Sequence, residues 1–231
     1  MTIGDVTRRL FVSPHLDDAV FACGQWIASS SHATVVTIFA ASAPHGAAPT
    51  PWDRECGFDA GDDVVALRRN EDRAALDILA ARAVWLDFHD DQYGEVRTKQ
   101  DIAEALRRIA ERAAPAAIHC PLGLFHADHR RASDASLALF DHFRSLAWHV
   151  YDDAIYRRIA GAADARRREL AGAGFALARV SPVMARDADV RKRHAVACYR
   201  SQLRALRTRN AHDDVFAAEA HWVLSRHGDP A

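Results

Sequence analysis

The sequence predicts an α/β fold, a Rossmann-like parallel sheet flanked by helices and followed by a less regular C-terminal part. Two observations support this prediction. Short apolar runs rich in β-branched residues recur along the chain, and segments with helical periodicity lie between them. Strands that alternate with helices in this way are typical of a parallel sheet with right-handed crossovers. A length of 231 residues suits one sizeable domain, so residues 1–231 are expected to form a single unit.

Each predicted element follows from its local pattern. Residues 33–40 (ATVVTIFA) are the clearest strand, because a continuous apolar run of this length is typical of a strand buried on both faces. The helix that begins at Thr98 is expected to stop before Pro115. In chain order, the expected strands are residues 9–13, 33–40, 83–88, 116–121, 147–151 and 175–182, and the expected helices are residues 17–30, 64–82, 98–113, 129–143 and 189–208.

Composition excludes several classes of protein. Lys and Arg together number 30 and Asp and Glu 31, so the net charge of −1 argues against a dedicated nucleic-acid binder. The first residues lack the apolar core of a signal peptide, and no run approaches the length of a membrane span. The cysteines are far apart and form no CxxC pair, which favours reduced thiols and a cytoplasmic location.

The first cluster of chemically active side chains follows the first strand, in the segment SPHLDDAVFACG. His15 and Asp18 are three residues apart, so both side chains can reach one ion, and imidazole with carboxylate is a ligand set that zinc accepts. Asp17 lies between them and can remain uncoordinated beside a water. The alternative is structural: Asp17 caps the following helix and His15 has no special role.

A second cluster follows the fourth strand, in the segment HADH. His129 is a candidate for a third metal ligand, and His126 for a donor to a developing oxyanion. Asp128 is a candidate for holding a histidine ring in one tautomer. The alternative is a polar helix start capped by Asp128. Both clusters lie beyond strand ends, where an open parallel sheet binds ligands, so together they predict a catalytic metal site.

These segments resemble the LmbE-like, or PIG-L, superfamily of zinc-dependent N-deacetylases. PHLDDA (residues 14–19) resembles its His-Pro-Asp-Asp-Glu motif, and HADH its His-x-Asp-His motif. ALRRNEDRAAL, YDDAIY and KRHAVACYRSQ resemble further family segments, so the resemblance runs from residue 9 to about residue 202. Two positions depart from the pattern: Leu16 replaces the usual Pro, and Ala19 replaces the usual Glu. The expected ligand and base positions are retained.

The resemblance implies a mechanism. His15, Asp18 and His129 would bind Zn²⁺, or another divalent transition metal, with one position open for water. Asp17 would act as the general base. A protonated His126, oriented by Asp128, would stabilise the oxyanion. The implied substrate is a small N-acetylated, sugar-like molecule.

Substrate contacts are expected at four further residues. Arg68 resembles a family residue that contacts substrate, although a helix-surface ion pair with Glu71 is the alternative. Asp90, after the third strand, is placed to bind sugar hydroxyls, and Asp91 is the alternative. Trp52 lies in the long loop of residues 41–63 and is a candidate for a substrate lid. Tyr199 is expected to line the pocket or simply to pack the last helix.

Other functions remain open at the level of sequence. The same metal site would serve an esterase or a deacylase for longer chains. A ferrous oxygenase with two histidines and one carboxylate is a second candidate, although the strand pattern argues against it. A catalytically silent binding domain is a third, and retention of Asp17 and His126 argues against that. The substrate, the acyl group and the oligomeric state do not follow from these residues.

Overall fold

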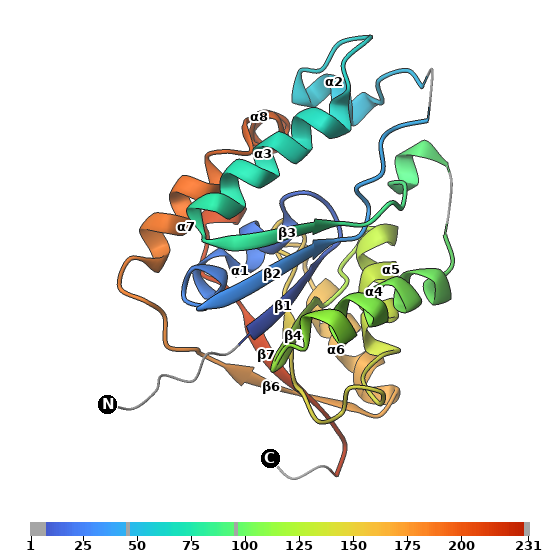
Figure 1. Cartoon of the computed structure of the whole chain (residues 1–231), viewed down its shortest axis with the longest axis vertical. Coiled ribbons are helices and arrows are strands. Elements are labelled where there is room, and N and C mark those ends of the chain that lie inside the picture. The colour runs from blue at the N-terminus through green and yellow to red at the C-terminus, as the bar shows by residue number, and fades with distance from the viewer. Residues whose placement is uncertain (1–7, 45–46, 95–96, 229–231) are drawn as a thin grey trace.

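The structure is a computed structural model that describes residues 8–44, 47–94 and 97–228. A mixed sheet lies at the centre with helices on both faces (Figure 1). The strands in the described part of the chain are β1 (Arg8–Ser13), β2 (His32–Thr37), β3 (Ala81–Trp85), β4 (Ala117–Pro121), β5 (Ala147–Tyr151), β6 (Phe175–Val180) and β7 (His221–Arg226).

The helices connect these strands and cover them. They are α1 (Asp18–Ala28), α2 (Pro51–Cys56), α3 (Val64–Ile78), α4 (Lys99–Ala113), α5 (Ala127–Leu137), α6 (Ala162–Gly172), α7 (Ala188–Val196) and α8 (Arg200–Thr208), with short 3-10 helices η1 (Asp91–Tyr93) and η2 (His212–Phe216). None of the described helices has the length and apolar character needed to cross a bilayer.

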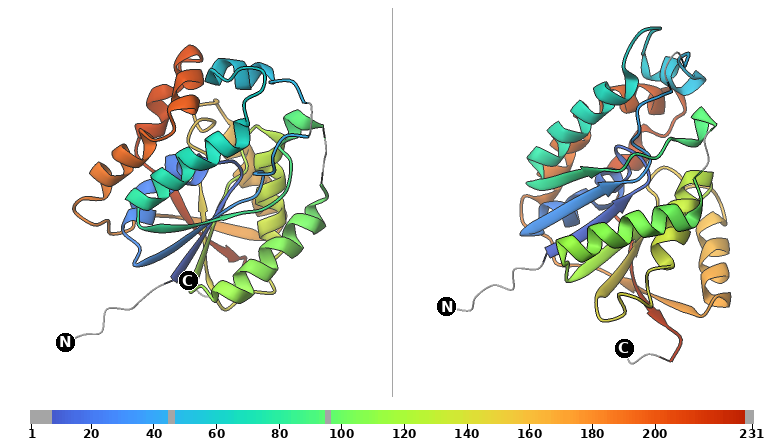
Figure 2. Two further views of the ribbon diagram at one scale, coloured as in Figure 1. Left: turned by 45° about the horizontal axis from the view of Figure 1, so that its top comes forward. Right: turned by 45° about the vertical axis from the view of Figure 1, so that its right-hand side comes forward.

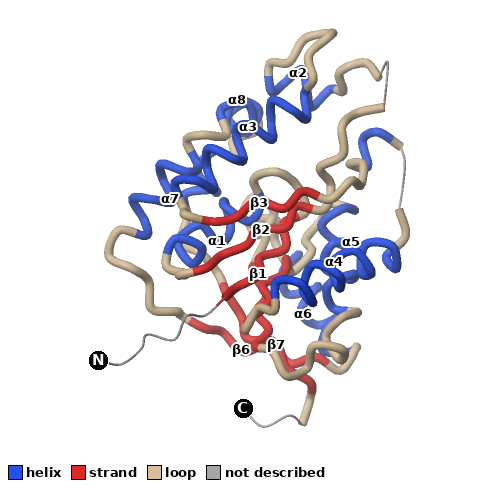
Figure 3. The backbone as a smooth tube through the Cα atoms, viewed as in Figure 1, coloured by secondary structure: helices blue, strands red, loops and turns tan. Residues whose placement is uncertain are grey.

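Alternating side chains of β1 pack into two separate hydrophobic cores, one on each face of the sheet. Phe11 packs with α1, α3, α7 and α8 on one face of the sheet. Leu10 and Val12 pack with α4 and α5 on the other. This alternation is the period-two pattern of a strand, and burial on both faces explains why β1 reads as an apolar run. Figures 2 and 3 show the resulting layers, with the strands enclosed between two groups of helices.

The strand order is β3-β2-β1-β4-β5-β7-β6. The first five strands in this order are parallel, as expected. From β1 the chain moves outward to β2 and β3, then returns to the other side of β1 to form β4. The order therefore reverses between β1 and β4, and a parallel sheet opens a crevice at the carboxyl ends of two such strands. The first motif follows β1 and the second follows β4, so this topology brings them together.

The C-terminal part differs from the expected arrangement in two ways. β7 runs antiparallel to both β5 and β6, so the sheet is mixed rather than wholly parallel. The single helix expected at residues 189–208 is two helices, because residues 197–199 interrupt it between Val196 and Arg200. The break places Tyr199 in the core, where it is fully buried. Helix α6 and strand β7 were not predicted.

The loop of residues 41–63 contains a short helix of its own. Thr50 and Asp53 form a capping box at the start of α2, with Pro51 at the first helical position. Gly57 ends the helix with a φ of 93°, a left-handed conformation that favours glycine. Helix α2 lies beside α8, where Trp52 Nε1 donates to Gln202 Oε1 at 3.1 Å. The loop is thereby held against the C-terminal helices.

Candidate active site

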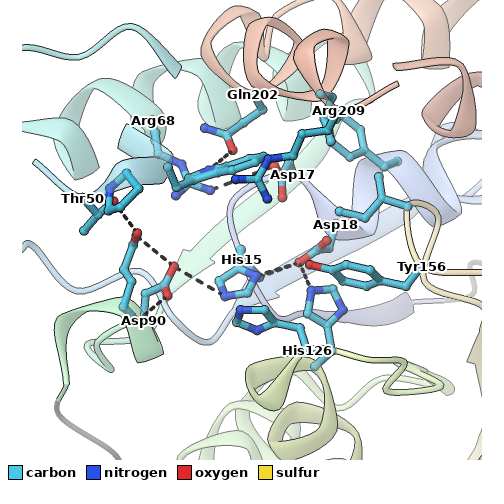
Figure 4. A pocket seen from close by; sticks show the side chains of 17 residues that line it. His15, Asp17, Asp18, Thr50, Arg68, Asp90, His126, Tyr156, Gln202 and Arg209 are labelled. Atoms are coloured by element: carbon cyan, nitrogen blue, oxygen red, sulfur yellow. Dashed lines mark hydrogen bonds and ion pairs between the residues drawn. The ribbon is translucent and has the colours of Figure 1, made fainter. Parts of the chain in front are cut away.

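The two motifs meet in a pocket of about 520 Å³ at the carboxyl ends of β1 and β4, a size typical of small-molecule sites. Figure 4 shows His15, Asp18 and His126 on one side of this space, with Arg68, Gln202 and Arg209 on the other side beside Asp17. The full lining is His15, Asp17, Asp18, Phe21, Thr50, Pro51, Trp52, Arg68, Asp90, Gln92, His126, His129, Ile155, Tyr156, Gln202, Leu206 and Arg209.

Three side chains in the pocket have the geometry of a zinc site. Asp18 Oδ2 lies 3.2 Å from His15 Nδ1 and 3.3 Å from His129 Nε2. Ligand atoms about 2.1 Å from a tetrahedral ion are separated by about 3.4 Å, so these distances fit one shared ion. His15, Asp18 and His129 therefore come together as the sequence predicted.

Both histidines of this group are oriented by a carboxylate. His15 Nε2 lies 3.1 Å from Asp128 Oδ2, and His129 Nδ1 lies 2.5 Å from Asp153 Oδ1. Each aspartate thus holds the ring nitrogen that faces away from Asp18, which leaves the other nitrogen free for a metal. This carboxylate–histidine pairing is common around zinc.

A second set of groups, His15, His126 and Asp128, is also close enough to share an ion. We favour the first set, because the oxygens of Asp128 already have partners. Its Oδ2 accepts from the N–H of Asp91 as well as from His15, and its Oδ1 accepts from Arg131 at 2.6 Å. A metal there would have to displace these hydrogen bonds.

Concentrated negative charge raises the pKa values of the two histidines. Burial alone would lower the pKa of His129, but Asp18 and Asp153 raise it to about 9. Burial likewise opposes protonation of His15, yet the carboxylates of Asp90, Asp128 and Asp18 raise its pKa well above the ordinary value. Positive charge is therefore favoured at the centre of the cluster, as a cation site requires.

Asp17 is available for chemistry because it does not cap the helix. It occupies the N-cap position of α1 but its side chain accepts no capping hydrogen bond; Ser13 Oγ accepts from the N–H of Ala19 instead. Its φ of 153° is one that L-residues rarely adopt, and such strain is often found at functional sites. Burial and the neighbouring charge of Asp18 raise its pKa well above the ordinary value, which suits a general base.

The structure revises the expected partnership of His126 and Asp128. The Asp128 carboxylate does not pair with the His126 ring, because Asp128 Oδ2 lies 4.0 Å from His126 Nδ1, too far for a hydrogen bond. Instead, His126 Nδ1 accepts the N–H of Asp128 at 3.3 Å and so caps α5. This hydrogen bond places the ring proton on Nε2. Burial and the nearby His15 lower the pKa of His126, so the neutral ring rather than the imidazolium is favoured.

Three of the four expected substrate contacts line the pocket. Arg68 is buried beside Asp17, with Nη2 4.0 Å from Oδ2, rather than exposed on a helix surface. Its expected alternative partner, Glu71, accepts from both the N–H and the hydroxyl of Ser201. Asp90 lines the wall near His15, and Trp52 lies on α2 beneath the guanidinium of Arg209.

Tyr199 does not line the pocket. It is fully buried, and its hydroxyl donates to Asp72 Oδ1 at 2.7 Å. Its role is to pack the junction of α7 and α8, the structural alternative that the sequence left open.

Several functional residues were missed at the level of sequence. Asp153 follows β5 and holds His129, and Tyr156 lies with its ring 4.9 Å from that of His129. A signal was present, because the paired aspartates of YDDAIY follow a strand end. Arg131, which pairs with Asp128, and Gln92, which accepts from Thr50 at 2.6 Å, had no comparable signal.

Comparison with known proteins gives a consistent result. The family model of PIG-L, described as GlcNAc-PI de-N-acetylase, matches residues 10–140. No curated protein matches the chain.

Solved structures match over nearly the whole chain. A triple mutant of a deacetylase of the teicoplanin biosynthetic pathway is 26% identical, with a TM-score of 0.80 over 97% of this chain and 100% of that chain. The deacetylase of the A40926 pseudoaglycone is 28% identical, with a TM-score of 0.76 over 98% and 100%. An N,N'-diacetylchitobiose deacetylase from Pyrococcus horikoshii, 18% identical with a TM-score of 0.54 over 86% and 71%, shares the fold.

Proposed function

The chain belongs to the PIG-L family of zinc-dependent N-deacetylases, and from this premise we propose that it hydrolyses the acetamide of an N-acetylated amino sugar within a natural product or conjugate. The observation that carries the proposal is the position of Asp17 beside His15, Asp18 and His129. Its backbone is strained, and its carboxyl makes no capping hydrogen bond to α1. A purely structural cluster would not require a carboxyl in such a position.

The residues divide into a metal-holding set and a proton-moving set. His15, Asp18 and His129 would hold Zn²⁺, which supplies Lewis acidity and lowers the pKa of water when bound. Asp17 accepts the proton of the attacking water and later delivers it to the leaving amine. Arg68, beside Asp17, favours the ionised carboxylate that the first step needs.

His126 is assigned to the developing oxyanion. Its Nδ1 is occupied by the cap of α5, so the proton on Nε2 is available for donation to the carbonyl oxygen. A neutral donor replaces the protonated one that the sequence suggested. Asp128 acts one step away, by fixing the ring of His15.

The polar wall of the pocket is suited to a sugar. Asp90, Gln92 and Thr50 line it next to the metal-holding group. They are linked by hydrogen bonds from Thr50 to Gln92 and from Gln92 to Asp90, and their remaining lone pairs and amide hydrogens can accept from and donate to sugar hydroxyls. Trp52 also lines the pocket, with the guanidinium of Arg209 4.7 Å from the centre of its ring. The two relatives that are 26% and 28% identical act in teicoplanin biosynthesis and on the A40926 pseudoaglycone, which supports a natural-product substrate.

Hydrolysis of another acyl group, or of an ester, is the second candidate, because it would use the same metal-holding set. We place the activity in the cytoplasm, supported by the free thiols of Cys23, Cys56, Cys120 and Cys198.

The test is amine release from a panel of N-acetylated amino sugars and their conjugates. Zinc-loaded protein should release amine, and Asp17→Asn should reduce the rate by at least about a hundredfold while zinc stays bound. Zinc content measured on both proteins is the control. An Asp17→Asn protein that remains fully active would show that another group is the base.

A further inference from the structure

We propose that Phe125 and Tyr156 form an apolar subsite at the mouth of the pocket, which binds an apolar group linked to the amino sugar of the substrate. The proposal deepens the proposed function and rests on it. Phe125 precedes His126, and its ring lies 5.5 Å from that of Tyr156, tilted by 36°. Both His126 and Tyr156 line the pocket, with their rings 6.4 Å apart and within 12° of parallel.

Phe125 is exposed although its neighbours are not. It is 72% accessible, whereas Leu122 and Leu124 just before it are fully buried. Burying a phenylalanine side chain stabilises a protein, and the free protein does not gain that stabilisation here. A ligand that covers the ring would gain it.

A strained turn holds Phe125 in this outward position. Its φ is 60°, and the N–H of His126 donates to the carbonyl of Leu124 at 2.7 Å, which closes a three-residue turn. A left-handed conformation is unfavourable for a residue other than glycine. Exposure and strain therefore both oppose a phenylalanine at this position in the absence of a ligand.

Asp153, which is hydrogen-bonded to His129 of the metal-holding group, also fixes the turn. Asp153 Oδ2 accepts from the N–H groups of Gly123 and Leu124, each at 2.9 Å, while its Oδ1 holds His129. The same carboxylate thus positions a zinc ligand and the backbone that presents Phe125. A ligand bound at Phe125 would therefore be placed at a set distance from the reacting centre.

The pocket is divided in a way that fits such a ligand. Asp90 and Thr50 lie on one side of His15, and Tyr156 lies on the other (Figure 4). Ile155 and Leu206 also line the pocket and add apolar surface to it. A sugar on the polar side with an aryl or alkyl group on the apolar side would satisfy both walls.

The test compares three substrates: free N-acetylglucosamine and its p-nitrophenyl and octyl glycosides. For Phe125→Ala, the ratio of kcat/KM for a glycoside to kcat/KM for the free sugar should fall about tenfold, and Phe125→Leu should restore part of it. Val183→Ala is the matched control, because Val183 is also an exposed apolar residue, 97% accessible, and lies in the loop between β6 and α7. A loss with the aryl glycoside alone would identify ring stacking, and a loss with both would identify a general apolar surface.

Measurements of glycoside binding test the subsite independently of the proposed reaction. Kd for the two glycosides is measured by calorimetry on zinc-loaded Asp17→Asn, with and without Phe125→Ala, so turnover is not required. Weaker glycoside binding without Phe125 supports the subsite even if the wild type releases no amine, an outcome that would reject only the choice of reaction. Unchanged affinity together with an unchanged kcat/KM ratio would overturn the subsite.

Discussion

Asp128 Oδ2 lies 3.1 Å from Nε2 of His15, a residue 113 positions earlier in the chain. The same oxygen lies 4.0 Å from Nδ1 of His126, its near neighbour in sequence. Asp128 is therefore a partner of the zinc-ligand position at the end of β1. Asp128 and His126, neighbours in the HADH motif, therefore have separate roles. Substitution of Asp128 should affect zinc binding, and substitution of His126 should affect the reaction rate.

Asp128→Asn should weaken zinc binding about 10–100-fold, because removal of a carboxylate that orients a ligand histidine has this effect in other zinc sites. The measurement is a zinc titration against a competing chelator. Asp128→Asn retains the size of the side chain, so a cavity does not complicate the result. Unchanged zinc affinity would contradict the assignment of Asp128 to His15.

His126→Ser should lower kcat about 10²–10³-fold, the usual effect of losing an oxyanion donor, with zinc affinity close to that of the wild type. Serine is chosen because it can still cap α5 but is too short to reach the substrate carbonyl. Zinc titration and kcat are measured on the same preparation. Loss of zinc with little loss of kcat in the loaded protein would instead favour the second set of metal ligands.

Gly24→Ala should destabilise the protein by about 1–3 kcal/mol through overpacking. A Cβ at Gly24 would lie 2.7 Å from Cγ of Lys192, whose buried ammonium is 2.9 Å from Glu219. The Lys192 side chain cannot swing away easily, because its Cβ would also lie 3.2 Å from the added atom and its ammonium is paired with Glu219. The measurement is the free energy of unfolding in urea.

The matched control for that variant is Gly172→Ala at the end of α6, where a Cβ would meet nothing within 4 Å. This change should be neutral or stabilise the protein by up to about 1 kcal/mol, because alanine is the better helix former. Equal destabilisation by both changes would rule out the contact with Lys192 as the cause.

A decrease in pH should destabilise the protein through His119 and His149, which stack at 4.7 Å between their ring centroids. Burial is the main cause that lowers the pKa of His149 to about 4 and that of His119 well below its ordinary value. Between about pH 6.5 and pH 4 the unfolded chain binds protons that the folded chain excludes, so the free energy of unfolding falls as the pH falls.

The expected slope is at most about 1.4 kcal/mol per pH unit for each of these histidines, and less for the partly exposed His149. His149→Gln should reduce the slope over this window, and His142→Gln, at a side chain that is 53% exposed, serves as the control. The measurement is urea unfolding at a series of pH values. A slope that His149→Gln leaves unchanged would show that other groups dominate.

Much of the fold could be predicted because its signals are local. Strands β1 to β5 are recognisable as apolar runs, and the helices between them as periodic patterns. Strand β7 was missed because its partners, β5 and β6, lie far away in the sequence, and its residues are not a continuous apolar run. The break between α7 and α8 was missed because residues 189–208 contain no Pro or Gly to mark the end of a helix.

The sequence by itself determined which chemical groups this protein has and that they follow the ends of strands: His15, Asp17 and Asp18 after one, His126 and His129 after another. Only the tertiary structure decided which carboxylate serves which histidine, giving Asp128 to His15 and Asp153 to His129. The physical reason is that a change of a few tenths of an ångström in the donor–acceptor distance decides whether a hydrogen bond forms. Strand order and helix packing set such distances between residues far apart in the chain.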